Sequence, residues 1–310
     1  MNPARHIGTA VLSLLFILSA APLRAQNSAN DDGLSKVLID GQNWELLAEG
    51  LGFTDGACSD AEGSFYFYDL GKGTAIRKIS PDGKVSDFIK DMPKCSGLKF
   101  GPDGRLYACT QGPKKQLIAI EVPSGKITVL ADNAQPNDLV VSHRGYAYYT
   151  DTGKGQVIIV DAKGGIRTGA GGINAPNGIT LSPDQNTLAV SEYRGTNVWT
   201  FRVSADGSLD AGARTMTLRT PLNKADSGGD GSTTDAAGRY YVTSHIGIQM
   251  FDAAGRWSGV IAKPTDKGCV SITFAGPGHA YLYACASDKI FRRKTQAKGS
   301  LFFQTPEPAK

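Results

Sequence analysis

The sequence predicts an all-β fold made of six copies of one structural unit. One copy is complete between residues 135 and 165, where apolar runs at 139–141, 146–150 and 157–160 are separated by glycine-containing turns. Short β-branched and aromatic runs bounded by Gly, Asn and Asp are typical of strands joined in hairpins. The 38 glycines and the modest 41% of hydrophobic residues also suit a β-protein with many turns.

The first hairpin turn of this unit recurs along the chain. Its turn residues are Gly63, Gly104, Gly145, Asn186, Gly238 and Gly278, at intervals of 41, 41, 41, 52 and 40 residues. A period of about 40 residues with about four strands per unit predicts a six-bladed β-propeller with four-stranded blades. The longer fourth interval predicts an insertion around residues 219–227.

The two ends of the chain bound this domain. Residues 1–25 have the features of a secretory signal peptide, with a basic start at Arg5 and an apolar core at 11–18. The apolar run is too short to span a membrane, although a retained anchor helix is the alternative. We therefore expect an exported protein, periplasmic or secreted, with no membrane attachment after cleavage. Residues 26–35 are polar and expected to be disordered, leaving 36–310 as one propeller domain with a short C-terminal tail.

Closure of the ring of blades needs one strand from outside the last repeat. The strand-like run at 44–50 would supply the outer strand of the last blade and join the two chain ends, and we favour this arrangement. The competing candidate is residues 300–304.

Charge excludes one class of partner. Loss of Arg5 and Arg24 with the signal lowers the formal charge from +4 to +2 (4 − 2 = 2), and no basic run contains interleaved aromatics. Nucleic-acid binding is therefore not expected. We expect a monomer whose partner is a small molecule.

One column of residues, at the start of the first strand of each unit, predicts a metal site. The column is Asp55, Ser96, Asn137, Asn177, Asp230 and Val270. The first strand of every propeller blade lines the central channel, so these side chains would form a ring at one mouth. Two carboxylates and two amide oxygens suit a hard cation; Ca²⁺ is expected, with Mg²⁺, Mn²⁺ and Zn²⁺ as alternatives. The competing explanation is turn chemistry alone, because the residues that follow the four are Gly56, Asp138, Gly178 and Gly231.

Four stretches around this column resemble the SMP-30/gluconolactonase family. They are TDGACSDAEGSFYFYD, QPNDLVV, APNGITLSPDQNTLAVSE and GGDGSTTDAAGRYYV, in family order within about 44–293. The resemblance implies a six-bladed propeller, one divalent cation and lactone hydrolysis. It assigns the metal ligands to Asp55, Asn137, Asn177 and Asp230, with Asp230 also the general base. Asp55 stands where the family usually has Glu, and Gln135 where many of its lactonases have Arg.

Other polar residues are expected near the same mouth. Asp151 and Glu192 end the second strands of units three and four, and His245 follows the second strand of unit five. Each is a candidate substrate contact or supporting residue, with a solvated strand end as the alternative, and Gln135 is a candidate of the same kind. Asp151 and His245 are also the reserve candidates for the base. The sequence contains no G-x-S-x-G, H-E-x-x-H or Walker-type motif.

The five cysteines suggest two cross-links. Cys95 and Cys109 flank the first hairpin of unit two, and Cys269 and Cys285 flank the first hairpin of unit six. Export would place both pairs in an oxidising compartment, so two disulfides are candidates. The alternative is buried free thiols, because directly paired strands often hold the two Cβ atoms at poor bonding angles. Cys58 is left over.

The family resemblance, together with the predicted metal ring, implies a Ca²⁺-dependent lactone hydrolase of the gluconolactonase type, in which water attacks a metal-polarised carbonyl at the channel mouth. Two other functions stay open. One is a non-catalytic binding propeller with a structural metal, and the other is a different ester or lactone hydrolase of the same fold.

Overall fold

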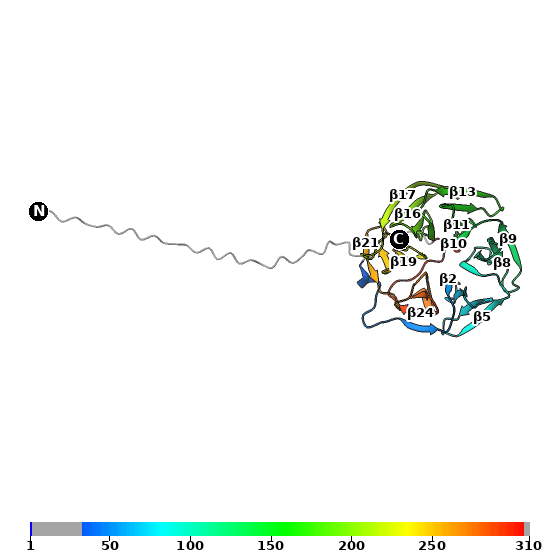
Figure 1. Cartoon of the computed structure of the whole chain (residues 1–310), viewed down its shortest axis with the longest axis horizontal. Helices are drawn as coiled ribbons and strands as arrows, with labels where there is room; N and C mark the ends of the chain where they lie inside the picture. Colours follow the sequence, from blue (N-terminus) through cyan, green and yellow to red (C-terminus); the bar gives the residue numbers. More distant parts are fainter. Residues whose placement is uncertain (2–32, 307–310) are drawn as a thin grey trace. The chain divides into compact units, whose positions relative to one another are not determined.

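The computed structural model describes Met1 and residues 33–306 and confirms the all-β prediction. Six antiparallel sheets of four strands each lie around a central axis as the blades of a propeller (Figure 1). The described residues contain two helices, the single-turn 3-10 helices η1 (Leu34–Lys36) and η2 (Pro277–His279). No described helix has the length and apolar character needed to cross a membrane.

Each blade contributes one strand to each of four positions between the axis and the rim. The innermost strands are β2 (Thr54–Ser59), β6 (Cys95–Phe100), β10 (Pro136–Val141), β14 (Pro176–Leu181), β18 (Ser232–Thr234) and β22 (Ser271–Ala275). The second strands are β3 (Phe65–Asp69), β7 (Leu106–Thr110), β11 (Ala147–Asp151), β15 (Thr187–Glu192), β19 (Tyr240–Ser244) and β23 (Tyr281–Ala286). The third strands are β4 (Ala75–Ile79), β8 (Leu117–Ile120), β12 (Gln156–Val160), β16 (Asn197–Val203), β20 (Gly247–Phe251) and β24 (Lys289–Lys294). The outer strands are β5 (Val85–Lys90), β9 (Ile127–Ala131), β13 (Ile166–Gly171), β17 (Leu209–Thr217), β21 (Trp257–Ile261) and β1 (Glu45–Ala48).

Burial follows this order from axis to rim. All five residues of β3 are buried, whereas the first three residues of β9 are exposed. Second strands are covered on both faces by the neighbouring blades, so they are uninterrupted apolar and aromatic runs rather than alternating ones. The cores lie between blades: Tyr107 and Leu117 of the second blade pack with Leu139 and Tyr149 of the third.

The sixth blade takes its outer strand from the N-terminal side of the chain. β1 pairs antiparallel with β24, with Glu45 opposite Arg292 and Leu46 opposite Phe291. An ion pair of 2.8 Å between Arg292 Nε and Glu45 Oε2 reinforces the register. The predicted closure by residues 44–50 is confirmed, and the alternative closure by residues 300–304 is wrong.

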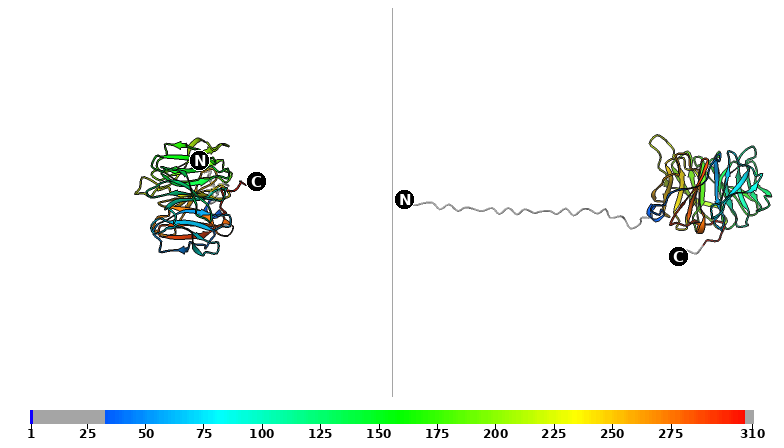
Figure 2. Two further views of the ribbon diagram at one scale, coloured as in Figure 1. Left: turned by 90° about the vertical axis from the view of Figure 1, so that its right-hand side faces the viewer. Right: turned by 90° about the horizontal axis from the view of Figure 1, so that it is seen from below.

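Residues 296–304 form a C-terminal strap that crosses one mouth of the channel instead. Backbone and side-chain hydrogen bonds fasten it to three blades: Ala236 N donates to Lys298 O (2.8 Å), Gly299 N to His279 O (3.0 Å) and Gln185 Nε2 to Phe302 O (2.8 Å). Figure 2 shows the C-terminal segment on one face of the propeller, and Figure 1 views the opposite face.

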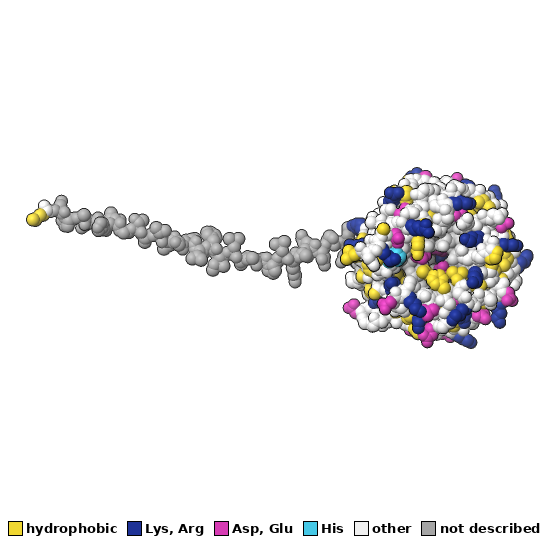
Figure 3. Space-filling model, viewed as in Figure 1, with side chains coloured by type: hydrophobic (Ala, Val, Ile, Leu, Met, Phe, Trp, Pro, Cys, Tyr) yellow, Lys and Arg dark blue, Asp and Glu magenta, His cyan; other side chains and the backbone are white. Residues whose placement is uncertain are grey.

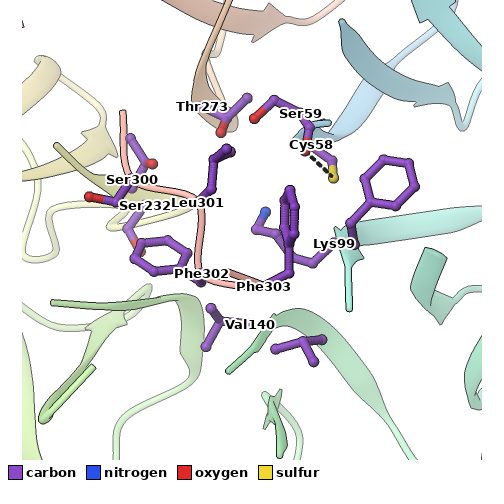
Figure 4. Close-up of a pocket in the computed structure, with 13 residues that line it drawn as sticks. Cys58, Ser59, Lys99, Val140, Ser232, Thr273, Ser300, Leu301, Phe302 and Phe303 are labelled. Atoms are coloured by element: carbon purple, nitrogen blue, oxygen red, sulfur yellow. Dashed lines mark hydrogen bonds between the residues drawn. The ribbon is translucent and has the colours of Figure 1, made fainter. Parts of the chain in front are cut away.

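Beneath the strap the channel narrows to a small cavity of about 30 Å³ (Figure 4). Its walls come from the ends of inner strands and from the strap, and include Cys58, Lys99 and Phe303. A volume of this size holds about one water molecule. The strap therefore closes this end of the channel, and the other mouth is the open one.

The beginning of the domain lies earlier than the sequence indicated. Residues 2–32, which include the predicted signal peptide and most of the expected disordered segment 26–35, lie outside the described residues. Leu34 and Ser35 were expected in that disordered segment, yet they belong to η1. Leu34 packs against Gly259 of β21, and Ser35 O accepts a hydrogen bond from Gln296 Nε2 (3.0 Å). Packing of the half-buried Leu34 side chain against β21 explains why this part of the chain is ordered in the domain.

Candidate functional site

The structure places the four predicted metal ligands at equivalent points around the open mouth. Asp55, Asn137 and Asn177 are each the second residue of an inner strand, and Asp230 lies two residues before β18. The ladder between the first two strands of a blade is irregular directly after the first three positions, between Asp55 and Cys58, Pro136 and Leu139, and Pro176 and Ile179. Such bulges release side chains from the strand's alternation and aim them differently.

Hydroxyl groups of the preceding blade hold three of these backbones in place. Ser96 Oγ donates to Asn137 O (2.6 Å), Thr150 Oγ1 to Asn177 O (2.8 Å) and Ser191 Oγ to Asp230 O (3.0 Å). Each bond joins two neighbouring blades at the height of the ring. The mouth is therefore a preorganised ring rather than a set of independent turns.

Glycine after the ring position lets adjacent inner strands approach closely. A Cβ atom on Gly178 would lie 2.2 Å from Asp230 O, and one on Gly231 would lie 2.6 Å from Val270 O. Both distances are far inside van der Waals contact, so any other residue would push the blades apart. The glycines in this column have a packing role that turn propensity alone does not explain.

The carboxyl groups at the mouth perturb one another. Burial, together with the charge of Asp138, raises the pKa of Asp55 to about 8. Burial also raises the pKa of Asp230 well above its usual range, and Asp55 and Asp138 add to this, while a hydrogen bond from the Asn177 side chain opposes it. These effects mean that Asp55, Asp138, Asn177 and Asp230 share one region of low dielectric.

Asp138 and Lys99 are two members of this region that the sequence reasoning missed. Asp138 is buried, and its pKa is raised by burial and lowered in part by Lys99. Lys99 Nζ donates to Ala57 O (2.8 Å) inside the channel. Asp138 could have been found in the sequence, because glycine follows the other three predicted ligands, Asp55, Asn177 and Asp230. Nothing in the local sequence singles out Lys99.

The donor set fits a divalent cation. Asp55, Asp138 and Asp230 are near enough to interact electrostatically, so excess negative charge there is destabilising unless protons or a metal ion neutralise it. Within residues 33–306 no three acidic, His or Cys side chains converge closely enough to hold an ion alone. The amide oxygens of Asn137 and Asn177 are therefore needed to complete a site. An all-oxygen set of this kind matches Ca²⁺ better than Zn²⁺.

Asp151 and Glu192 are buried under the turns that follow their strands, and neither is a solvated strand end. Asp151 Oδ1 accepts from Lys154 N (3.0 Å). Glu192 accepts from Trp199 Nε1 and Asn197 Nδ2, both at 2.8 Å. Burial opposes ionisation of Glu192, but these donors outweigh it and leave its pKa below the usual value. Both carboxylates therefore have structural hydrogen bonds at the mouth.

Gln135 is exposed on the rim of the same face. It lines a polar groove of about 450 Å³ between the second and third blades, together with Lys114, Lys115 and Asp132. The groove opens two residues from Asn137, so it lies where a substrate could extend outward from the ring.

His245 has a partner that the sequence did not reveal. Its Nε2 atom lies 2.8 Å from Oδ1 of Asp226, which belongs to the predicted insertion between β17 and β18. The side chains are 25% and 38% exposed, so the pair is at the surface of the mouth rather than in the core. Figure 3 shows acidic and histidine side chains near the centre of this face.

All five cysteines are buried free thiols, so the two candidate disulfides are not formed in this structure. The strand register gives the physical reason. Cys95 is opposite Thr110 while Cys109 is opposite Gly97, and Cys285 is opposite Ser271 rather than Cys269. Burial raises the pKa of each thiol, which keeps it in the unreactive protonated form.

Fold and mouth together define a six-bladed propeller with a polar, acidic ring at one end of a closed channel. Residues 53–287 match the model of the SMP-30/Gluconolactonase/LRE-like region, and the chain belongs to this family. It is 24% identical over 295 residues to a gluconolactonase of Zymomonas mobilis, covering 82% of each chain. It is 26% identical over 297 residues to lactonase drp35 of Staphylococcus saprophyticus, covering 84% of this chain and 88% of that one.

Solved structures show the same fold. A gluconolactonase from Xanthomonas campestris superposes with a TM-score of 0.73 and 21% identity, covering 84% of this chain and 92% of that chain. The calcium-binding protein regucalcin from Agrobacterium tumefaciens superposes with a TM-score of 0.68 and 16% identity, covering 84% of this chain and 97% of that chain.

Proposed function

We propose that this protein is a lactone hydrolase of the gluconolactonase type that requires a divalent cation, most simply Ca²⁺. The observation that carries the proposal is the group of carboxyl and amide side chains at the open mouth, where the charge of Asp138 raises the pKa of Asp55 and the charges of Asp55 and Asp138 raise the pKa of Asp230. The gluconolactonase and lactonase relatives, aligned over about four fifths of the chain, support lactones as the substrate class.

Asp55, Asn137, Asn177 and Asp230 would hold the cation. When bound, it supplies electrophilic assistance at the lactone carbonyl and stabilises negative charge on that oxygen. Asp138 adds negative charge to this region although it does not belong to the predicted ligand column. The positive charge of Lys99 offsets part of that negative charge and lowers the pKa of Asp138. Ser191 and Thr243 fix the Asp230 backbone through its O and N atoms, at 3.0 Å in each case.

Asp230 is the proposed acceptor of the proton from the attacking water. A carboxylate that also holds a dication is a weakened base, so Asp230 serves only through an oxygen left free to face the water. Of the two reserve bases, Asp151 has one carboxylate oxygen bound to the Lys154 amide and the other 3.5 Å from Lys154 Nζ. His245 has one ring nitrogen available, because Nε2 lies against Asp226.

The closed far end of the channel supports this assignment. Substrate and water reach the ring from one side, because the strap covers the other mouth. A non-catalytic propeller with a structural metal is the second candidate, and the Asp55 and Gln135 departures favour it. We also propose that residues 1–25 act as a signal peptide and direct export of the protein.

A panel of lactones and aryl esters, assayed with metal-free and Ca²⁺-loaded protein, tests the function. We expect lactone hydrolysis that is lost in chelator and restored by Ca²⁺. The matched control is the Asp161→Asn variant, which neutralises a half-buried carboxylate on the β12–β13 turn, away from the ring. Ca²⁺ binding by titration calorimetry without turnover of any substrate would refute catalysis and favour the structural metal.

A further inference from the structure

The insertion between β17 and β18 brings a carboxylate to the only histidine that the structure places at the open mouth among residues 33–306. Asp226 Oδ1 lies 2.8 Å from His245 Nε2. Among the described residues none forms a hydrogen bond with Nδ1 of this ring, and the His245 side chain is 25% exposed. A carboxylate that accepts one imidazole N–H fixes the ring and stabilises positive charge on it.

The pair is held at a defined position relative to Asp230. His245 N donates to Ser227 O (2.9 Å) and Asp230 N donates to Thr243 O (3.0 Å), so residues 227–230 run antiparallel to residues 243–245. On the 243–245 side, two residues of extended chain separate the bonded positions, which corresponds to a backbone spacing of roughly 7 Å. A water molecule at Asp230, the carbonyl carbon that it attacks and the ring oxygen would together bridge a separation of that order.

Packing leaves the imidazole little freedom. A Cβ on Gly228 would lie 2.4 Å from His245 Cε1, so the ring lies directly over this glycine. Gly228 has a φ of +59°, a conformation that favours glycine for a second reason. Tyr193 completes the surroundings: burial, and then the charges of Asp230 and Asp226, raise its pKa, which makes it a poor proton donor.

We propose that His245, oriented by Asp226, is the general acid that protonates the departing alkoxide; this inference rests on the proposed lactonase function. Water adds to the carbonyl carbon and loses a proton to Asp230. The bond between that carbon and the ring oxygen then breaks, and the ring oxygen takes the proton from His245 Nδ1. His245 recovers a proton from solvent, and Asp230 releases one. The sum is lactone plus water giving a hydroxy acid.

The chemistry needs such a donor for one group of substrates only. Expulsion of an alkyl alkoxide is slow without a proton, because the alkoxide is a strong base. A phenolate leaves as a stable anion and gains little from a proton donor. The dependence of the rate on the leaving group therefore distinguishes two roles for His245. A general acid that protonates the alkoxide assists alkyl substrates only, whereas a general base that activates the water assists both kinds of substrate equally.

The test compares His245→Gln and Asp226→Asn with the parent on lactones and esters graded by the acidity of the alcohol released, from an alkyl lactone to the phenolic lactone dihydrocoumarin. We expect both variants to lose about 10²-fold or more in kcat on the alkyl lactone and at most about threefold on the phenolic one. Ca²⁺ affinity, measured by calorimetry, should stay within about twofold, because neither residue belongs to the ring. His143→Gln is the matched control; His143 binds Gln185 (2.9 Å) at the far mouth.

Each result decides between the proposals. Equal losses on all substrates, or no loss, would overturn the role of His245 while leaving the lactonase function in place. A parent that hydrolyses nothing would overturn both. If His245→Gln fails to fold, Asp226→Asn carries the same expectation, since removal of its charge leaves the imidazole in place but no longer stabilised as a cation.

Discussion

Replacement of Asp55 by Asn should stabilise the metal-free protein while it weakens the stabilisation by calcium. The pKa of Asp55 is raised from 3.8 to about 8, first by burial and then by the charge of Asp138. Between these two pH values the folded carboxyl holds a proton that the unfolded chain has lost. The free energy of unfolding therefore falls as pH rises through this window, and below it the penalty is absent.

The difference between the two pKa values corresponds to about 6 kcal/mol, as an upper limit, because one pH unit is worth about 1.4 kcal/mol. Asp55 is only partly buried at the mouth, and solvent screening should reduce the measured effect to about 3 kcal/mol. We expect Asp55→Asn to exceed the parent by about that amount at pH 8 in chelator, and to match it near pH 4.

Urea unfolding at both pH values, with chelator or with Ca²⁺, measures this effect. Calcium at about 100 times its dissociation constant should stabilise the parent by about 2.7 kcal/mol and the variant by much less. Equal stability of parent and variant at pH 8 in chelator would refute the electrostatic reasoning. An unchanged response to Ca²⁺ would remove Asp55 from the metal site.

Three further outcomes follow from other parts of the molecule. Asp230→Ala should lose both turnover and metal affinity, whereas Asp230→Asn should keep much of the affinity and lose about 10²–10⁴-fold in turnover. Calorimetry measures the affinity, and a pH-indicator assay with saturating Ca²⁺ measures the turnover. Near-parent turnover by the Asn variant would exclude Asp230 as the base. Glu192→Gln should lower the free energy of unfolding by about 1.5–3 kcal/mol at pH 7. Because the pKa of Glu192 is lowered in the folded protein, its stabilising effect is present above the unfolded pKa and disappears as pH falls through the folded pKa. The free energies of unfolding of parent and variant should therefore become equal in acid. Truncation after Ala297 should expose Cys58 under the strap, so a thiol reagent should label it ahead of the other four cysteines; unchanged labelling would show that the strap does not seal the channel.

The parts of the fold that repeat were predictable from the sequence. Six hairpin turns at a regular spacing identified the blades. The last repeat has one strand too few and would leave an unpaired edge, so the strand-like run at 44–50 identified the closing strand. The ring column at Asp55, Asn137, Asn177 and Asp230 was also visible as a register position, and the structure places these residues at one mouth.

The contacts that could not be predicted from the sequence depend on how far apart neighbouring blades and loops lie in space. Lys99 reaches a neighbouring inner strand, and Asp226 comes from an insertion whose conformation no repeat dictates. The cysteine pairs were judged from hairpin spacing, but a bulge at Cys95 offsets the register by one residue. The burial of Asp151 and Glu192 was hidden for a similar reason, since turns fold back over the strand ends.

The pairing of β1 with β24 sets the order in which this chain becomes complete. β1 ends at Ala48 and its partner begins at Lys289, so about 240 residues separate the first and last strands of one sheet. At roughly 5–20 residues per second, β1 waits for roughly ten to fifty seconds of synthesis before its partner exists. Throughout that time the chain carries an unpaired edge, and blades one to five cannot close into a ring. Premature cleavage or stalling anywhere before residue 289 would therefore leave an open, aggregation-prone arc rather than a smaller functional protein.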